Sequence, residues 1–362
     1  MKTRAMVLEG FNLPLTMREF EIPRLQEGEI LIRVEAAGVC GSDVHMWRGE
    51  DPRTPLPIIL GHEGVGRVLE VKGEKLTIEG DLLKSGDLIL WNRGVSCHRC
   101  FHCAVLNDPA LCKNRKVYGI NRSSNVPPYV NGCYSQEMVL TADTDIFRID
   151  AQVDPAILVS ASCSGATVAH AFDLHRPEFG DTVLIQGPGP LGVYAVAFAR
   201  NMGAREVIVI GGSENRLKTC REFGATLTLN RRELSIEERR QAIMDKTRGR
   251  GVDFAIEAVG DPAAVHEGIK LVRSGGAYVS IGFSQPPGDC QIDFFQEVVS
   301  KNLKIQGVWV SGTRHTWQAM KLVLENPELF ARMITHRFSL EQANDALNSM
   351  AHRDALKAVL IP

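Results

Sequence analysis

Residues 181–192 read DTVLIQGPGPLG, an apolar segment followed by Gly187, Gly189 and Gly192 in the pattern G-x-G-x-x-G. The first glycine permits a tight turn, the second lets a backbone approach a pyrophosphate, and the third lets a helix pack closely on a strand. Pro190 and Leu191 would begin that helix, whose unpaired N–H groups favour an anion. The segment therefore predicts a strand, a turn and a helix that bind a dinucleotide.

Apolar segments and amphipathic segments alternate along the chain after residue 181. This alternation of strand and helix segments predicts βαβ units and a parallel sheet. The predicted strands are TVLIQ (182–186), EVIVI (206–210), DFAIEAVG (253–260) and GGAYVSIG (275–282), and the predicted helices are 191–201, 214–223 and 262–272. We therefore expect an α/β fold with a doubly wound Rossmann sheet over residues 161–297.

The chain before residue 150 has a different pattern of apolar and polar residues. Short β-branched runs such as EILIRVEAAGV (29–39) and SQEMVLTA (135–142) are broken by turn signals, which predicts a β-rich domain with long loops. The last apolar segment, ALKAVLI (355–361), is expected to return to that sheet, so that residues 1–160 and 298–362 form one domain. An apolar strand at 304–310 with a free edge suggests a homodimer or homotetramer.

Composition excludes some partners. The 362 residues hold 41 Lys and Arg against 43 Asp and Glu, so no polybasic field is available for nucleic acid or for a membrane surface. No uninterrupted run of about 18 apolar residues is present, and we expect a cytoplasmic protein. In a reducing compartment, nine cysteines mark metal sites, catalysis or core positions more often than disulfides.

Four of the nine cysteines are crowded into the segment CHRCFHCAVLNDPALC within a lobe at residues 92–115. Two consecutive C-x2-C steps and a fourth cysteine after a short excursion suit a tetrahedral zinc ion. Four sulfur ligands leave no open position, so this zinc would be structural. The ligands are Cys97, Cys100, Cys103 and Cys112.

The end of the second predicted strand bears on the choice of nucleotide. An acidic residue is expected there to hold the ribose 2′-OH of NAD, but EVIVI runs into Gly211. Ser213 and Arg216 could instead hold a 2′-phosphate, although Glu214 between them would oppose it. The sequence thus leaves NADP or NAD open, with a preference for NADP.

A second metal site is suggested by three dispersed residues, Cys40, His62 and Cys163. Two thiolates and one imidazole would leave a fourth position for water or substrate, as in a catalytic zinc site. Each residue alone has an ordinary alternative, because single cysteines are usually core residues and single histidines beside glycine are usually loop residues.

Taken together, the ordered motifs GVCGSDVHMWRG, LGHEGVG, the four-cysteine segment, Cys163 and DTVLIQGPGPLG resemble zinc-dependent medium-chain alcohol dehydrogenases over nearly the whole chain. The resemblance implies that the β-rich domain is the GroES-like catalytic domain of that family. It also implies that Cys40, His62 and Cys163 hold the catalytic zinc. Glu63 matches a glutamate that approaches the metal, and Asp43 would orient His62.

The resemblance implies four further roles. Ser42 would hydrogen-bond the substrate oxygen, and His45 would pass the proton to solvent. Thr167 would contact the nicotinamide region, and Lys357 would contact the pyrophosphate. The chain departs from the usual pattern of the family in one spacing: the segment between Cys103 and Cys112 has one residue more than is usual.

The expected activity is reversible hydride transfer between an alcohol and NAD(P)+, with one catalytic and one structural zinc per chain. Alternatives are a zinc-free quinone or enone reductase of the same superfamily, and a non-catalytic NAD(P)H-binding protein. Trp47, Trp91 and Arg93 fall where pockets of the family are lined, which suits a secondary, cyclic or bulky primary alcohol. Arg93 would meet an anionic substrate, or it would be a solvated or cofactor-side residue.

Overall fold

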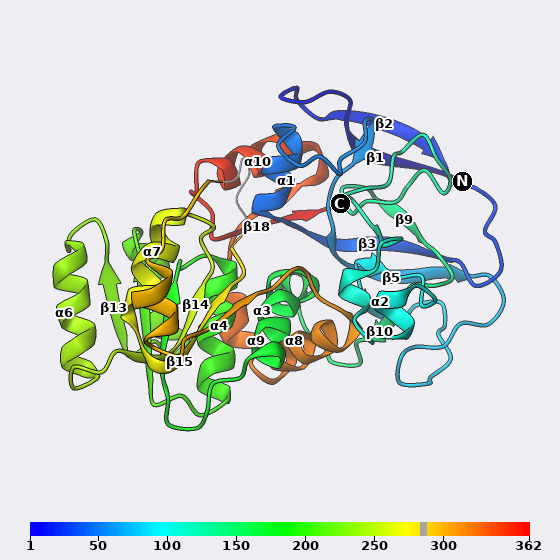
Figure 1. Cartoon of the computed structure of the whole chain (residues 1–362). Coiled ribbons are helices and arrows are strands. Elements are labelled where there is room, and N and C mark those ends of the chain that lie inside the picture. The colour runs from blue at the N-terminus through cyan, green and yellow to red at the C-terminus, as the bar shows by residue number, and fades with distance from the viewer. Residues whose placement is uncertain (283–287) are drawn as a thin grey trace. The chain divides into compact units, whose positions relative to one another are not determined.

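The computed structural model describes residues 1–282 and 288–362, and the chain divides into two compact units (Figure 1). The first unit comprises residues 1–166 and 311–362, and the second comprises residues 167–310. Because the division falls after Ala166, Cys163 lies in the first unit with the other predicted metal ligands.

The second unit is built on a six-stranded sheet in the order β13-β12-β11-β14-β15-β16, with every neighbouring pair parallel. This is the strand order of a doubly wound dinucleotide-binding fold, and its direction reverses between β11 and β14. The strands are β11 (Thr182–Gln186), β12 (Glu206–Gly211), β13 (Leu227–Asn230), β14 (Val252–Glu257), β15 (Val272–Ser280) and β16 (Lys304–Gly307). The connecting helices are α4 (Pro190–Asn201), α5 (Glu214–Glu222), α6 (Ile236–Lys246) and α7 (Pro262–Leu271).

The strand predicted near residue 304 corrects the domain boundary drawn at residue 298. β16 pairs in parallel with β15, from Ala277 opposite Lys304 to Ser280 opposite Gly307, and so extends the second unit's sheet. The chain returns to the first unit only at Ser311. An apolar strand pattern shows that a segment is extended, but it does not show which sheet edge the backbone hydrogen bonds join.

The first unit is β-rich and contains three sheets. The largest has the order β10-β6-β5-β3-β18-β17, with β9 also paired to β3. β18 (Lys357–Ile361) is antiparallel to β3 (Ile30–Val39), which brings the C-terminal strand beside the strand that leads to Cys40. The other strands of this unit are β1 (Lys2–Leu8), β2 (Thr16–Glu21), β4 (Ile58–Ile59), β5 (Glu63–Val71), β6 (Leu88–Trp91), β7 (Gly94–Val95), β8 (Lys116–Val117), β9 (Glu137–Leu140), β10 (Ile146–Arg148) and β17 (Ile334–Ser339).

Helices connect and flank these strands. In the described residues, no single helix has the length and apolar composition needed to cross a membrane. Together, the short helix Pro155–Ser162 and α3 meet those criteria, but they are bent by 45° and the short helix is buried from Ala156 onward. The remaining helices are α1 (Gly41–Trp47), α2 (Phe101–Ala104), α3 (Ser164–Leu174), α8 (Thr313–Glu325), α9 (Pro327–Ala331) and α10 (Ala343–Ala351).

Candidate metal and nucleotide sites

The four clustered cysteines converge in the loop around α2, with their sulfurs all within 4.8 Å of one another. Cys100 Sγ lies 3.5 Å from Cys103 Sγ, and Cys112 Sγ lies 3.5 Å from Cys97 Sγ. Four sulfurs placed about 2.3 Å from one tetrahedral zinc would be about 3.8 Å apart, so the observed cluster fits that ion. None of these cysteines forms a disulfide.

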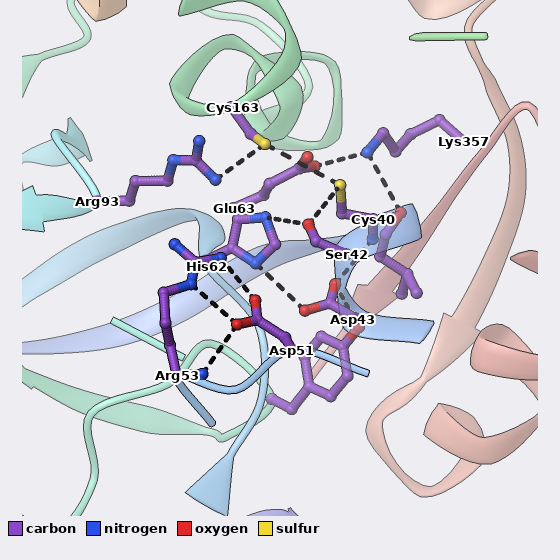
Figure 2. Close-up of polar contacts among 12 residues, drawn as sticks. Cys40, Ser42, Asp43, Asp51, Arg53, His62, Glu63, Arg93, Cys163 and Lys357 are labelled. Atoms are coloured by element: carbon purple, nitrogen blue, oxygen red, sulfur yellow. Dashed lines mark hydrogen bonds and ion pairs between the residues drawn. The ribbon is translucent and has the colours of Figure 1, made fainter. Parts of the chain in front are cut away.

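A second cluster joins Cys40, His62, Glu63 and Cys163, whose ligand atoms also lie within 4.8 Å of one another (Figure 2). Cys40 Sγ is 4.0 Å from Cys163 Sγ. Ser42 Oγ donates to Cys40 Sγ at 3.2 Å and lies 3.5 Å from His62 Nε2. Two sulfurs and one ring nitrogen with a hydroxyl beside them are the donor set of a three-ligand zinc site.

Local structure explains how the chain presents this second cluster. Cys40 stands just before α1, and its backbone N–H donates to Asp43 Oδ2 at 2.8 Å, which ties both residues to the start of the helix. His62 follows Gly61, whose φ of +91° is readily available only to glycine. A Cβ at Gly61 would meet the Tyr134 ring at 2.4 Å. The turn that directs His62 inward therefore requires glycine.

Asp43 orients the imidazole of His62. The two side chains are fully buried, and Asp43 Oδ1 lies 3.2 Å from His62 Nδ1, so the other ring nitrogen faces the cysteines. Burial lowers the pKa of His62, but the charge of Asp43 and the hydrogen bonds to Asp43 and Cys40 together raise it to about 9. Tyr134, which belongs to none of the sequence motifs, donates its hydroxyl to Asp43 Oδ2 at 3.2 Å.

The two thiols respond to each other in a way that suits a cation. Their hydrogen bond lowers the pKa of Cys40 well below its usual range and, together with burial, raises the pKa of Cys163. A metal ion bound between the two sulfurs would take the place of the thiol protons and neutralise both thiolates.

Lys357 is placed differently from the prediction that it contacts the pyrophosphate. Its side chain is fully buried, and Nζ lies 2.7 Å from Glu63 Oε2 and 3.2 Å from the carbonyl oxygen of Val39. Burial lowers the pKa of Lys357, but the charges of Glu63 and Cys40 and the hydrogen bond to Glu63 together raise it by a larger amount, so the amine keeps its charge. A buried ammonium needs a buried partner, and Glu63 supplies one in the metal-binding cluster.

His45 lies on α1, a turn after the residues that face the metal donors. Its Nδ1 is 2.5 Å from Glu50 Oε2, and its side chain is 26% exposed. The ring is therefore partly exposed to solvent, with a carboxylate as partner. Arg93, noted from the sequence as a pocket residue, instead donates from Nη1 to Cys163 Sγ at 3.0 Å (Figure 2).

The glycine-rich turn of the second unit has the geometry that a dinucleotide requires. Gly187 has a φ of +101°, and a Cβ on Gly192 would lie 1.9 Å from the Gly187 carbonyl oxygen. Gly189 caps α4, followed by Pro190 and then Leu191, and no atom lies within 4 Å of where a Cβ on Gly189 would be. The helix N-terminus is thus open to an anionic group.

The residues predicted to choose the nucleotide follow β12. Gly211 ends the strand, Ser213 caps α5 without using its side chain, and Arg216 lies in the first turn. Two further arginines, which belong to none of the sequence motifs, lie close to the same turn. A Cβ on Gly212 would lie 3.1 Å from Arg231 Nε and 3.5 Å from Arg232 Nε.

Thr167, the remaining predicted cofactor residue, is the first residue of the second unit and is buried on α3. Its contact with the nicotinamide region stays a prediction.

Comparison with known proteins identifies the family. Residues 26–151 match the alcohol dehydrogenase GroES-like domain, and residues 190–325 match the zinc-binding dehydrogenase domain. The chain belongs to the zinc-dependent medium-chain dehydrogenase/reductase family. The resemblance drawn from the sequence motifs is therefore confirmed, as is the combination of a GroES-like domain with a Rossmann sheet.

Individual relatives span nearly the whole chain. The 5-exo-hydroxycamphor dehydrogenase of Pseudomonas putida is 34% identical over 92% of this chain and 91% of the relative. The L-threonine 3-dehydrogenase of Bacillus subtilis is 30% identical over 100% of this chain and 99% of the relative. Both are dehydrogenases named for alcohol substrates, which places this chain among the oxidoreductases that act on CH–OH groups.

Solved structures of zinc-type dehydrogenases match the fold of the whole chain. An alcohol dehydrogenase from Thermotoga maritima matches with a TM-score of 0.98 and 53% identity, over 100% of both chains. A chain from Sinorhizobium meliloti, described as a zinc-binding dehydrogenase and bound to NADP, matches with a TM-score of 0.87 and 28% identity, also over 100% of both. The chain is a zinc-dependent, NAD(P)-dependent dehydrogenase of the alcohol dehydrogenase type.

Proposed function

We propose that this dehydrogenase catalyses reversible hydride transfer between a secondary, cyclic or bulky primary alcohol and NAD(P)+, giving a ketone or an aldehyde. The convergence of Cys40, His62 and Cys163 around one point, with the Ser42 hydroxyl beside them, carries this proposal. The relatives support the substrate class, since hydroxycamphor and threonine are both secondary alcohols.

A zinc ion held by Cys40, His62 and Cys163 supplies a Lewis acid that lowers the pKa of an alcohol O–H, and the nicotinamide supplies the hydride acceptor. Ser42 Oγ, placed beside both Cys40 and His62, is positioned to accept the alcohol proton in a hydrogen bond. Asp43 holds the His62 ring in the orientation that points Nε2 at the donors.

His45 is the residue that we propose moves the proton onward to solvent. Its partly exposed ring, with Nδ1 in contact with Glu50 Oε2, favours this role, because an imidazole can accept a proton at one ring nitrogen and release it from the other. The Glu63–Lys357 pair holds a negative charge next to the donors and keeps it balanced.

The proposal is tested on purified, zinc-loaded protein with secondary, cyclic and bulky primary alcohols and both nucleotides, following NAD(P)H absorbance. We expect oxidation of at least one class, and we expect Ser42→Ala to lower kcat by about 10²- to 10⁴-fold, because general base catalysis typically contributes that much. Ser42→Thr keeps the hydroxyl and should retain most of the rate. A panel without any turnover, or Ser42→Ala at the wild-type rate, would refute the assignment.

We propose that the preferred nucleotide is NADP(H). No acidic side chain stands at the end of β12, the side chains of Arg231 and Arg232 lie beside Gly212, and Ser213 and Arg216 follow Gly212 in the chain. The opposing residue, Glu214, is engaged by Arg221, whose Nη2 lies 2.5 Å from Glu214 Oε1. A cluster of guanidinium groups with a hydroxyl suits a 2′-phosphate better than a 2′-hydroxyl.

Arg216→Ala should therefore weaken NADP(H) binding by about 1 to 3 kcal/mol and leave NAD(H) nearly unchanged, because the charged hydrogen bond exists only with the phosphate. Lys218→Ala removes an exposed cation from the same helix and is the matched control. The Kd of each nucleotide can be measured by fluorescence titration. An equal loss for both nucleotides would remove the basis for an NADP preference.

We further propose that the protein is a homodimer or homotetramer assembled through the outer edge of β16. Among the described strands, β16 pairs only with β15, so its other edge is open to a second copy. Analytical ultracentrifugation should then give a molecular mass that is two or four times the 39.9 kDa of one chain. A monomer at micromolar concentration would count against this assembly.

A further inference from the structure

Arg93 lies against one of the predicted metal ligands and is almost closed off from solvent. It connects β6 to β7 and is 6% exposed. Its Nη1 donates to Cys163 Sγ at 3.0 Å (Figure 2), and its covered Nε has no hydrogen-bond partner among the described residues. This placement favours a role toward the metal ligand over the contact with an anionic substrate that the sequence left open.

The backbone around Arg93 is held by neighbouring groups. Asn92 Oδ1 accepts the backbone N–H of Gly94 at 3.1 Å, and Asn92 Nδ2 donates to Thr313 Oγ1 at 2.9 Å. The carbonyl oxygen of Arg93 accepts the backbone N–H of Tyr118 at 3.1 Å. Because the chain is fixed on both sides of Arg93, its side chain approaches the sulfur from a set position.

The two cysteines of the catalytic set receive different hydrogen-bond donors. Cys40 Sγ accepts from the hydroxyl of Ser42 at 3.2 Å, the same hydroxyl that we propose accepts the proton of the alcohol. Arg93 has no such second duty, and its guanidinium does not lose its proton at ordinary pH. Cys163 therefore keeps a charge-assisted hydrogen bond throughout the reaction.

The charges around the metal position give this hydrogen bond a counterpart. Two thiolates neutralise a zinc ion and a zinc-bound imidazole is neutral, so Asp43 keeps its negative charge beside His62. Arg93 supplies one positive charge beside Cys163. Two further acidic side chains near the donors have their own cations, in the pairs Glu63 with Lys357 and Asp51 with Arg53 (Figure 2). Arg93 thus balances the charge of Asp43.

Asp43 and Arg93 act on their ligands in opposite directions. A carboxylate behind a metal-binding imidazole makes that ring a stronger electron donor. A guanidinium that donates to a thiolate draws electron density away from the sulfur and makes it a weaker donor. A metal ion that receives less electron density from its ligands is a stronger Lewis acid, which is the property that lowers the pKa of an alcohol O–H.

We propose that Arg93 is a positioning residue of the catalytic metal site, whose hydrogen bond to the Cys163 thiolate weakens that ligand as an electron donor and keeps the bound metal a strong Lewis acid. This inference rests on the proposed alcohol dehydrogenase activity and adds a residue to it. Arg93 acts through Cys163, so its effect falls on the metal and on the rate of hydride transfer.

Cobalt(II) in place of the catalytic zinc reports on this hydrogen bond, because a cobalt ion bound by thiolates absorbs light as charge moves from sulfur to metal. A hydrogen bond stabilises the sulfur electrons and raises the energy of that absorption. We expect the charge-transfer band to move to longer wavelength in Arg93→Met, which removes every donor, and to move less in Arg93→Lys, which keeps a charged donor. Arg67→Met removes an arginine on β5 that pairs with Glu35 and should leave the band unchanged.

Two controls assign the band to the correct metal site. Elemental analysis gives the cobalt and zinc content of each chain, and cobalt-loaded Cys40→Ser supplies the spectrum of the four-cysteine cluster alone for subtraction. Where Arg93→Met does not fold, Arg93→Gln, which is uncharged and too short to reach the sulfur in the same way, takes its place with the same expected shift. A band at the wild-type wavelength in these variants contradicts the inference.

Single-turnover rates of zinc-loaded protein test the consequence for the chemistry. The rate of hydride transfer per bound zinc should fall about 10- to 100-fold in Arg93→Met, the range typical of groups that hold metal ligands, and Arg93→Lys should recover part of it. Arg67→Met should keep the wild-type rate. A wild-type rate per zinc in Arg93→Met would mean that Arg93 serves only folding or metal loading, and the inference would be wrong.

The cobalt measurement separates this inference from the proposed function. It requires no turnover, so an unchanged band refutes the role of Arg93 even in a protein that oxidises alcohols. A wild-type protein that oxidises no alcohol of the panel refutes the proposed function instead, and a shifted cobalt band would then still support the action of Arg93 on a metal-binding Cys163.

Discussion

Cys40→Ser is expected to lower alcohol oxidation by about 10³-fold or more, because the catalytic metal stabilises charge that develops during the reaction and several kcal/mol of that stabilisation would be lost. The fold should survive, since Cys40 lies between β3 and α1 and its backbone contact with Asp43 does not involve the sulfur. Steady-state kinetics with the best alcohol of the panel measure the loss.

Two measurements show that the effect of Cys40→Ser is local. NAD(P)H should bind the variant with nearly the wild-type Kd, because the glycine turn at Gly187 and Gly189 belongs to the second unit. Cys290→Ser removes a cysteine that belongs to neither metal cluster and should leave turnover unchanged. Full alcohol oxidation by Cys40→Ser would show that this cluster is not the catalytic centre.

Cys100→Ser is expected to act on stability instead. The loop that carries α2 exposes several apolar side chains, among them Phe101 at 60% and Val105 at 62%, so it has little core of its own. Binding energy of a structural zinc is folding energy for such a loop. Loss of several kcal/mol should lower Tm by about 10 °C or more, given about 2 to 4 °C per kcal/mol for a domain of this size.

Differential scanning calorimetry of metal-loaded proteins measures that change. Cys290→Ser is again the matched control and should melt near the wild-type temperature. A Cys100→Ser variant that keeps the wild-type Tm and does not aggregate would contradict a structural role for the four-cysteine cluster.

The features best predicted from the sequence are those in which local spacing carries the chemistry. Four cysteines within one short loop can converge with few alternatives, and the structure brings their sulfurs within 4.8 Å. The glycine pattern at 187–192 likewise depends on backbone geometry that few other residues allow, and Gly187 has the positive φ that the pattern requires.

Features that depend on distant parts of the chain were harder to predict. Lys357 lies 294 positions from Glu63 in sequence, and only the pairing of β18 with β3 brings its amine to the metal-binding cluster. The partner of the strand at 304–307 was hard to predict for the same reason, because an apolar pattern does not indicate which strand a segment pairs with. Arg231 and Arg232 follow β13, a strand whose sequence LTLN is too short and polar to be recognised.

Zinc counting by elemental analysis tests the central claim, that the Cys40, His62 and Cys163 set and the four-cysteine loop are separate metal sites with separate duties. We expect two zinc ions per chain in wild type and in Cys290→Ser. Cys40→Ser should hold one zinc and oxidise alcohols at most about 10⁻³ as fast as wild type, and the folded fraction of Cys100→Ser should also hold one zinc but retain activity. Two zinc ions and full activity in Cys40→Ser would contradict the assignment of the catalytic site.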